Sequence, residues 1–211
     1  MQTITIFLLS YFLGSIPFAY IFGKILRGID IRRYGSGNVG ATNAFRVLGK
    51  PIGLLVLFLD VTKGLFTIIL ANKFYRTGFL PWETVLVISG ILCVIGHSLT
   101  IFLRFKGGKG IATSIGVLWG LSLYLPHLGM ILIILILIWI LIFTLTRIVS
   151  VASIISALFL PLLCVIYKQP TFVIFTCLFL STFVLYRHKS NLKRILKGEE
   201  KPLDFGKRKQ L

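Results

Sequence analysis

Residues 128–146 read LGMILIILILIWILIFTLT, a stretch without a single charged side chain. A helix crosses the hydrocarbon core of a bilayer with about 20 consecutive apolar residues. Comparable runs lie at roughly residues 3–23, 52–71, 83–103, 111–126, 148–167 and 171–186. The pattern predicts an all-α integral membrane protein with seven transmembrane helices. The separations at Pro126 and Arg147 are the weakest, so five spans with re-entrant pieces form the alternative count.

The composition of the 211-residue chain supports this class. Apolar residues make up 56% of the chain and charged residues only 14%, and the mean hydropathy is +0.94, which does not describe a water-soluble globule. We expect one polytopic domain over residues 1–211. The first apolar run has no basic start and no cleavage site, so we expect a retained helix instead of a signal peptide. Cys93, Cys164 and Cys177 fall inside apolar runs and are predicted to be small buried hydrophobic residues.

Lys and Arg gather on one side of the predicted helices. If the seven helices alternate in direction, 19 of the 23 Lys and Arg residues lie in odd-numbered loops and the C-terminal tail, and three lie on the opposite side. The positive-inside rule then places the N-terminus outside and the C-terminus in the cytoplasm. The net charge of +17 is therefore a charge of the cytoplasmic face, where it also attracts anionic lipid headgroups.

Three polar segments, at residues 30–50, 96–113 and 187–206, all fall in these predicted cytoplasmic loops. The first contains YGSGNVGATNAFR at residues 34–46. Its glycines allow main-chain N–H groups to approach an anion, its amide and hydroxyl side chains add donors, and Arg46 can hold a phosphate with two hydrogen bonds. A glycine-rich connector is the alternative. We reject a dinucleotide-binding fingerprint because a predicted membrane span, and not a strand, precedes it.

The second segment places Lys106 and Lys109 around two glycines, directly before a predicted helix. Main-chain N–H groups and the helix N-terminus are expected to converge there on a phosphate. Anchoring by the positive-inside effect is an equal alternative for each lysine alone. His97 lies about two helical turns from this loop and is a site candidate; the alternative is a helix-end residue without a catalytic role.

The third segment spaces His188 and Asn191 three residues apart, so a helix would carry both on one face. A basic helix that only touches lipid headgroups is the alternative. Asp60 and Lys63 have the same spacing within the second predicted span, where ionisable side chains usually have a function. A buried structural ion pair is the slightly preferred interpretation of these two residues.

The six carboxylates of the chain form no cluster in the sequence that would hold Mg²⁺ at a phosphate, so metal-dependent phosphoryl transfer is not expected. None of the three histidines has an aspartate five residues later, so the His-x-x-x-x-Asp pair of many glycerolipid acyltransferases is also absent. Seven helices with a basic vestibule would also suit an organic-anion transporter or channel. Against that class, no inverted repeat is visible.

Three ordered motifs carry a family resemblance: GSGNVGATN at residues 35–43, FKGGKGIAT at residues 105–113, and HKSNLKR at residues 188–194 followed by GEE at residues 198–200. They resemble the bacterial acyl-phosphate:glycerol-3-phosphate acyltransferases, the PlsY family, over nearly the whole chain. The resemblance implies transfer of a fatty acyl group from acyl phosphate to the 1-hydroxyl of sn-glycerol-3-phosphate in phospholipid biosynthesis. It implies multi-pass insertion in the bacterial cytoplasmic (inner) membrane, an active site at the cytoplasmic face and no metal or other cofactor. Contact with the synthase that makes acyl phosphate is expected, and nucleic acid is not.

The resemblance and the chemistry of the motifs together assign the candidate residues. The catalytic candidates are Ser36, Arg46, His97, Lys106, His188 and Asn191. The substrate-binding candidates are Gly37, Asn38, Thr42, Asn43, Gly107, Gly108, Lys109, Gly110, Thr113 and Arg194. Glu199 and Glu200 are both candidates for the acid of the third motif.

The group that removes the proton from the attacking hydroxyl has three candidates: His97, His188 and a phosphate oxygen of the donor. We favour the phosphate oxygen, because the three motifs contain no acid directed at a histidine and a phosphate oxygen lies next to the carbonyl under attack.

Overall fold

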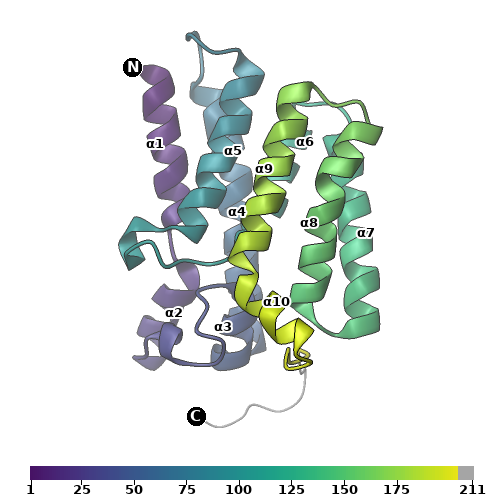
Figure 1. Ribbon diagram of the computed structural model, residues 1–211. Helices are drawn as coiled ribbons and strands as arrows, with labels where there is room; N and C mark the ends of the chain where they lie inside the picture. The colour runs from purple at the N-terminus through teal and green to yellow at the C-terminus, as the bar shows by residue number, and fades with distance from the viewer. Residues whose placement is uncertain (204–211) are drawn as a thin grey trace. The chain divides into compact units, whose positions relative to one another are not determined.

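The computed structural model describes residues 1–203, and all regular secondary structure within that range is helical (Figure 1). This confirms the all-α prediction. The α-helices are α1 (Gln2–Ser15), α2 (Phe18–Arg27), α3 (Ala41–Leu48), α4 (Lys50–Phe74), α5 (Trp82–Ser98), α6 (Ile111–Ser122), α7 (Leu128–Thr146), α8 (Val149–Ile166), α9 (Thr171–Arg187) and α10 (Lys189–Leu196), and the 3-10 helices are η1 (Ile31–Arg33) and η2 (Ile101–Leu103). The last three residues of the predicted loop at 187–206 lie outside the described residues.

Each of the seven apolar runs contains a helix, but the helices differ in length. By length and composition, four segments of residues 1–203 could cross a membrane, or up to six if each bent pair forms one span. The bent pairs are α1 with α2, at 41°, and α9 with α10, at 61°. Helix α6 has only 12 residues. The count of seven spans and the orientation of the chain therefore stay predictions.

Large apolar side chains cover much of the outer surface of the long helices. Phe58 on α4 is 63% exposed, Leu137 on α7 is 59% exposed, and Phe175 on α9 is 65% exposed. Soluble proteins rarely show apolar surface on this scale. Such a surface is suited to contact with lipid.

The structure divides into two compact units, which we call the N-terminal unit (residues 1–121) and the C-terminal unit (residues 122–203). In the N-terminal unit, α5 packs against α1 and α4, and α4 also packs against α3. In the C-terminal unit, α8 packs between α7 and α9 (Figure 1). The prediction of a single domain over residues 1–211 stays a prediction.

Glycines allow the helices of the N-terminal unit to approach each other closely. A Cβ at Gly14 of α1 would overlap the main chain of Cys93 on α5, and a Cβ at Gly116 of α6 would overlap the main chain of Val61 on α4. Helix association in lipid depends on such close packing, because water does not drive apolar surfaces together there. These contacts fix the position of α4 and α5, which carry the central side chains of the candidate site.

A proline organises the packing of α8 against α9 in the C-terminal unit. Pro161 lies inside α8 and has no N–H to donate to the carbonyl of Ala157, four residues earlier. The hydroxyl of Ser181, on α9, donates to that carbonyl instead. Cys164 and Cys177 meet across the same pair of helices, with sulfur atoms 3.5 Å apart, and all three cysteines are buried as predicted.

Candidate active site

The first polar loop is held by one buried amide, that of Asn43 on α3. Its side-chain oxygen accepts a hydrogen bond from the N–H of Ser36 at 2.8 Å. Its nitrogen donates to the carbonyls of Asn38 at 2.9 Å, Tyr34 at 3.1 Å and Ile31 at 3.3 Å. Only 1% of Asn43 is exposed. This side chain therefore lies beneath the loop and braces it from within, and its predicted role in binding substrate stays a prediction.

The side chains that remain at the surface of this loop are the ones with anion-binding chemistry. Ser36 and Arg46 are exposed, and Asn38 and Thr42 are half-buried. Gly35 and Gly37 have φ values of 60° and 71°, in the left-handed region that glycine adopts without strain. The tight turn leaves Ser36 exposed at the surface, while the buried Asn43 side chain binds the main-chain N–H of Ser36.

The second polar loop folds back onto the end of α5. The N–H of Gly107 donates to the carbonyl of Ser98 at 3.1 Å, and the N–H of Gly108 donates to the carbonyl of His97 at 3.0 Å. The sequence predicted that N–H groups of this loop would bind phosphate. These two donate to main-chain carbonyls of the protein, and the substrate-binding roles of Gly107 and Gly108 stay predictions. The charged anion-binding candidates of this loop are Lys106, which is exposed, and Lys109, which is half-buried.

The two glycines are nevertheless needed for the geometry. A Cβ at Gly107 would overlap the carbonyl oxygen of His97, and a Cβ at Gly108 would overlap its Nε2 atom. The absence of both side chains lets the loop lie against the imidazole ring. His97 and the second motif are thus brought together as predicted, through the small size of the two glycines and through their N–H groups, which donate to the end of α5.

Three hydroxyls close to this region are buried without a hydrogen-bond partner among residues 1–203. They belong to Ser15 on α1, Ser98 on α5 and Thr113 on α6, and none of these residues has measurable exposure. Ser98 packs near Gly110, directly before α6. Buried polar groups normally have partners, so these hydroxyls are available to a polar ligand or to water.

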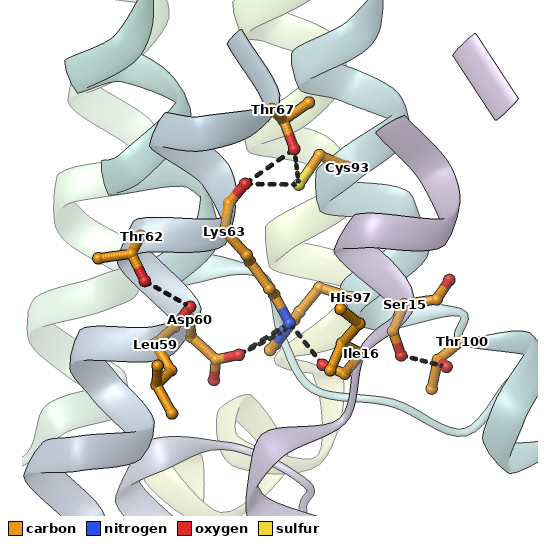
Figure 2. Close-up of polar contacts among 10 residues, drawn as sticks. All are labelled: Ser15, Ile16, Leu59, Asp60, Thr62, Lys63, Thr67, Cys93, His97 and Thr100. Atoms are coloured by element: carbon orange, nitrogen blue, oxygen red, sulfur yellow. Dashed lines mark hydrogen bonds and ion pairs between the residues drawn. The ribbon is translucent and has the colours of Figure 1, made fainter. Parts of the chain in front are cut away.

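Asp60, Lys63 and His97 form a buried polar cluster (Figure 2). The Lys63 ammonium lies 2.8 Å from Oδ1 of Asp60, 3.0 Å from Nδ1 of His97, and 2.9 Å from the carbonyl oxygen of Ile16, to which it donates. The exposed fractions of Asp60, Lys63 and His97 are 2%, 4% and 7%. The predicted contact between Asp60 and Lys63 is confirmed.

The inclusion of His97 in this cluster was not predicted. Oδ1 of Asp60 lies 3.5 Å from Nδ1 of His97, so an acid outside the three motifs does approach a histidine. A charge within a membrane span requires polar partners, and this requirement was the one sequence signal that could have linked Asp60 to a side chain of the neighbouring span.

The third motif forms a second polar cluster, within the C-terminal unit. Oε1 of Glu200 accepts from the amide of Asn191 at 2.5 Å and from the hydroxyl of Ser150 at 2.6 Å, and Oε2 accepts from Nε of Arg194 at 2.6 Å. Burial raises the pKa of Glu200, but the hydrogen bonds from Arg194, Ser150 and Asn191 outweigh it and hold the pKa below its ordinary value. Glu199 is exposed, so Glu200 is the acid that organises this motif.

His188 lies where α9 gives way to α10 and is 2% exposed. Its Nδ1 atom is 2.8 Å from the carbonyl oxygen of Val184. The predicted helix after His188 is present as α10. The roles of His188, Asn191 and Arg194 toward substrate stay predictions.

Comparison with known proteins places the chain among similar sequences along nearly its full length. The family model described as glycerol-3-phosphate acyltransferase matches residues 4–198. The glycerol-3-phosphate acyltransferase of Fusobacterium nucleatum is 40% identical over 197 residues, with 93% of this chain and 96% of the relative covered. The corresponding Synechocystis sp. protein is 41% identical over 203 residues, with 93% and 88% covered.

A solved structure shows the same fold. The crystal structure of PlsY, an integral membrane glycerol 3-phosphate acyltransferase, in its glycerol 3-phosphate form has a TM-score of 0.85 and 37% identity, with 97% of this chain and 96% of that chain covered. Its lysophosphatidic acid form has a TM-score of 0.82 and is also 37% identical. The match covers 96% of this chain and 95% of that chain. The predicted class, an all-α integral membrane protein, is confirmed by this similarity.

Proposed function

Since this chain belongs to the glycerol-3-phosphate acyltransferase family, we propose that it transfers a fatty acyl group from acyl phosphate to the 1-hydroxyl of sn-glycerol-3-phosphate. The products are 1-acylglycerol-3-phosphate, which is lysophosphatidic acid, and inorganic phosphate. The acceptor and the product are supported by the two forms in which the similar PlsY structure is described, with glycerol 3-phosphate and with lysophosphatidic acid. The donor is supported by the three sequence motifs.

The observation that carries the proposal is the exposure of anion-binding side chains on the first two polar segments, both in the N-terminal unit. A site for this reaction must hold two phosphate groups together and stabilise the oxyanion that forms at the acyl carbonyl. Ser36 is exposed on the first loop, Arg46 is exposed on α3 directly after it, and Lys106 is exposed on the second loop. We assign the leaving phosphate and the oxyanion to Ser36, Asn38 and Arg46, and glycerol-3-phosphate to the second motif.

The proposed chemical step needs only positioned substrates. The oxygen of the 1-hydroxyl forms a bond to the acyl carbonyl carbon, and the bond between that carbon and the phosphate oxygen breaks. The hydroxyl proton moves to an oxygen of the departing phosphate, which leaves as hydrogen phosphate. Acyl phosphate is a mixed anhydride, so its leaving group needs little further activation. The donor's own phosphate then serves as the base, and the protein supplies orientation and charge.

The remaining assignments also belong to the proposal. His188, Asn191 and Arg194 position glycerol-3-phosphate, with Glu200 holding the latter two in place. The reaction takes place at the cytoplasmic face of a bacterial membrane, where the basic loops are expected. The synthase that makes acyl phosphate is the expected protein partner, because its product must reach this membrane face.

The test uses purified protein in lipid nanodiscs, supplied with a long-chain acyl phosphate. Phosphate release and formation of lysophosphatidic acid are expected only when glycerol-3-phosphate is present, and acyl-CoA in place of acyl phosphate is expected to give no product. Release of phosphate without an acylated product would contradict the proposal. Uptake of glycerol-3-phosphate into proteoliposomes without acylation would favour a transporter.

Arg46 provides the sharpest variant for the same assay. Arg46→Lys keeps the charge but loses the paired hydrogen bonds to phosphate, and a hydrogen bond to a charged group contributes about 1.5–3 kcal/mol. We expect kcat/KM to fall by roughly 10- to 150-fold. Arg76→Lys, at another exposed arginine, is the matched control and is expected to retain activity. Equal activity of the two variants would remove Arg46 from the site.

A further inference from the structure

The buried cluster around Lys63 is not used by the chemical step described above, although it is the most deeply buried charged group among residues 1–203. We propose that Lys63, held by Asp60, is a positioning residue that keeps His97 protonated at Nε2. His97 then donates a hydrogen bond to a substrate phosphate and does not act as the base. The substrate part of this inference rests on the proposed function.

Three polar atoms that can accept hydrogen bonds surround the Lys63 ammonium. Oδ1 of Asp60 lies at 2.8 Å, the carbonyl oxygen of Ile16 at 2.9 Å and Nδ1 of His97 at 3.0 Å. An ammonium group has three donors and no acceptor. The ammonium therefore has three polar partners within 3.0 Å, one through an ion pair and two through hydrogen-bond contacts, as Figure 2 shows.

This arrangement assigns the tautomer of His97. Because Lys63 can only donate, Nδ1 must accept, and in a neutral imidazole the single proton then sits on Nε2. The alternative is a proton on Nδ1 donated to Asp60. The distance between Nδ1 and Oδ1 of Asp60 is 3.5 Å, which is longer than that to Lys63 and beyond the usual range for an N–H···O hydrogen bond.

The protonated Nε2 faces the second polar loop. A Cβ at Gly108 would overlap this atom, so Nε2 lies directly against the Gly107–Gly108 turn. The two glycine N–H groups donate to the end of α5 and do not supply that face with donors. On this proposal, the Nε2–H group is the donor that His97 offers to a phosphate bound beside Lys106 and Lys109.

His188 has the opposite environment within the C-terminal unit. Its Nδ1 atom lies 2.8 Å from the carbonyl oxygen of Val184, and a carbonyl can only accept, so His188 carries its proton on Nδ1. The two histidines thus provide an internal comparison in one molecule. His97 is expected to be protonated at Nε2 and His188 at Nδ1.

The first test is nitrogen-15 NMR of the nanodisc protein labelled in its histidine rings, near neutral pH. The chain has three histidines. The variants His127→Gln and His188→Gln each remove the signals of one other ring, and the signals that remain in both belong to His97. We expect a protonated Nε2 and an unprotonated Nδ1 for His97. A proton on Nδ1, or on both nitrogens, would overturn the inference. This result needs neither a substrate nor a variant of the cluster.

The second test is Lys63→Met, which removes the donor and keeps most of the side-chain length. Without Lys63, the ring of His97 is expected to carry its proton on Nδ1 and to donate it in a hydrogen bond to Asp60. An unchanged tautomer would overturn the role of Lys63. Lys73→Met, at an exposed lysine of the same helix, is the matched control and should leave the spectrum unchanged. If Lys63→Met does not fold, the wild-type spectrum still decides the tautomer.

Kinetics add a readout that a purely structural role would not produce. An unprotonated Nε2 facing an anion costs one charge-assisted hydrogen bond, so the KM for glycerol-3-phosphate of Lys63→Met should rise by about 10- to 100-fold. The kcat at saturating glycerol-3-phosphate should change much less. A fall in kcat with unchanged KM would make His97 the base and overturn the inference. If the wild-type protein transfers no acyl group but shows the expected tautomer, the proposed function fails and the tautomer assignment stands.

Discussion

Asp60 and Glu200 each hold a polar motif together with one carboxylate, but they do so at different depths. Asp60 is 2% exposed and lies inside α4, and its partner Lys63 is 4% exposed. Glu200 follows α10, and the side chain of its partner Arg194 is 38% exposed. Water can reach one side of the Glu200 cluster, while the charges of the Asp60 cluster depend on each other.

The difference determines what the loss of one partner costs. A buried charge that loses its counter-charge stays desolvated and uncompensated, whereas a partly exposed one can turn to water. The Asp60 cluster should therefore respond to single substitutions as an all-or-none unit. The Glu200 cluster should respond in smaller steps.

The largest effect is expected from Asp60→Asn. This change leaves the Lys63 ammonium buried without a carboxylate, which should lower the free energy of unfolding by about 3–5 kcal/mol. Thermal unfolding in detergent, followed by circular dichroism, measures it. The double variant Asp60→Asn/Lys63→Met removes both charges and should recover much of the loss. A single variant as stable as the wild type would show that water reaches this cluster.

A smaller effect is expected from Glu200→Gln. The amide still accepts hydrogen bonds but loses the charge that Arg194 binds, so unfolding should become easier by about 1–2 kcal/mol. Glu199→Gln changes the neighbouring exposed acid and is the matched control, with no measurable effect expected. Similar losses for both variants would contradict the assignment of Glu200 as the organising acid.

The stability difference between the wild type and Glu200→Gln should also depend on pH. The pKa of Glu200 lies below its ordinary value in the folded protein, so its stabilising contribution is complete above the unfolded pKa of about 4.3. That contribution is lost as the pH falls through the lower pKa that Glu200 has in the folded protein. The stability gap between wild type and Glu200→Gln should be constant from neutral pH down to about pH 5 and shrink below about pH 4. A gap that stays constant into strong acid would contradict it.

The smallest effect is expected at the loop that begins the first motif, where Asp30 pairs with Arg32 at 2.7 Å. The hydrogen bond from the Arg32 side chain is the main cause that lowers the pKa of Asp30 to about 2. The Arg32 side chain is 33% exposed, and such surface pairs contribute roughly 0–1 kcal/mol. Arg32→Gln should therefore leave the unfolding temperature almost unchanged. A loss comparable to that of Asp60→Asn would show that exposure does not control these pairs.

Contacts within one helix could be predicted from the sequence, and contacts across the fold could not. The spacing of Asp60 and Lys63 is enough to predict that they meet, because neighbours three residues apart share a helix face. Their contact with His97 crosses 34 positions of sequence and depends on how α4 packs against α5. The apolar runs likewise predicted helices, since their composition is a local property.

The candidate site shows the same limit. Composition indicated that the glycine loops have small side chains and many donors, but it does not say which donors the fold uses. The N–H groups of Gly107 and Gly108 bind the end of α5, and the Asn43 amide binds its own loop. The choice between Glu199 and Glu200 depends on where the chain turns after α10. Each of these outcomes is set by tertiary hydrogen bonds that leave no pattern in the sequence.

The hydrogen bond from Ser181 to the carbonyl of Ala157 has a consequence for how this family can change over evolutionary time. Pro161 removes the helical donor of that carbonyl, and an unsatisfied carbonyl in lipid costs several kcal/mol. A lineage that loses the hydroxyl first carries the penalty, whereas one that first replaces the proline is free to lose the hydroxyl later. Substitutions at positions 161 and 181 are therefore coupled in order, so relatives with proline and no hydroxyl donor should be rare.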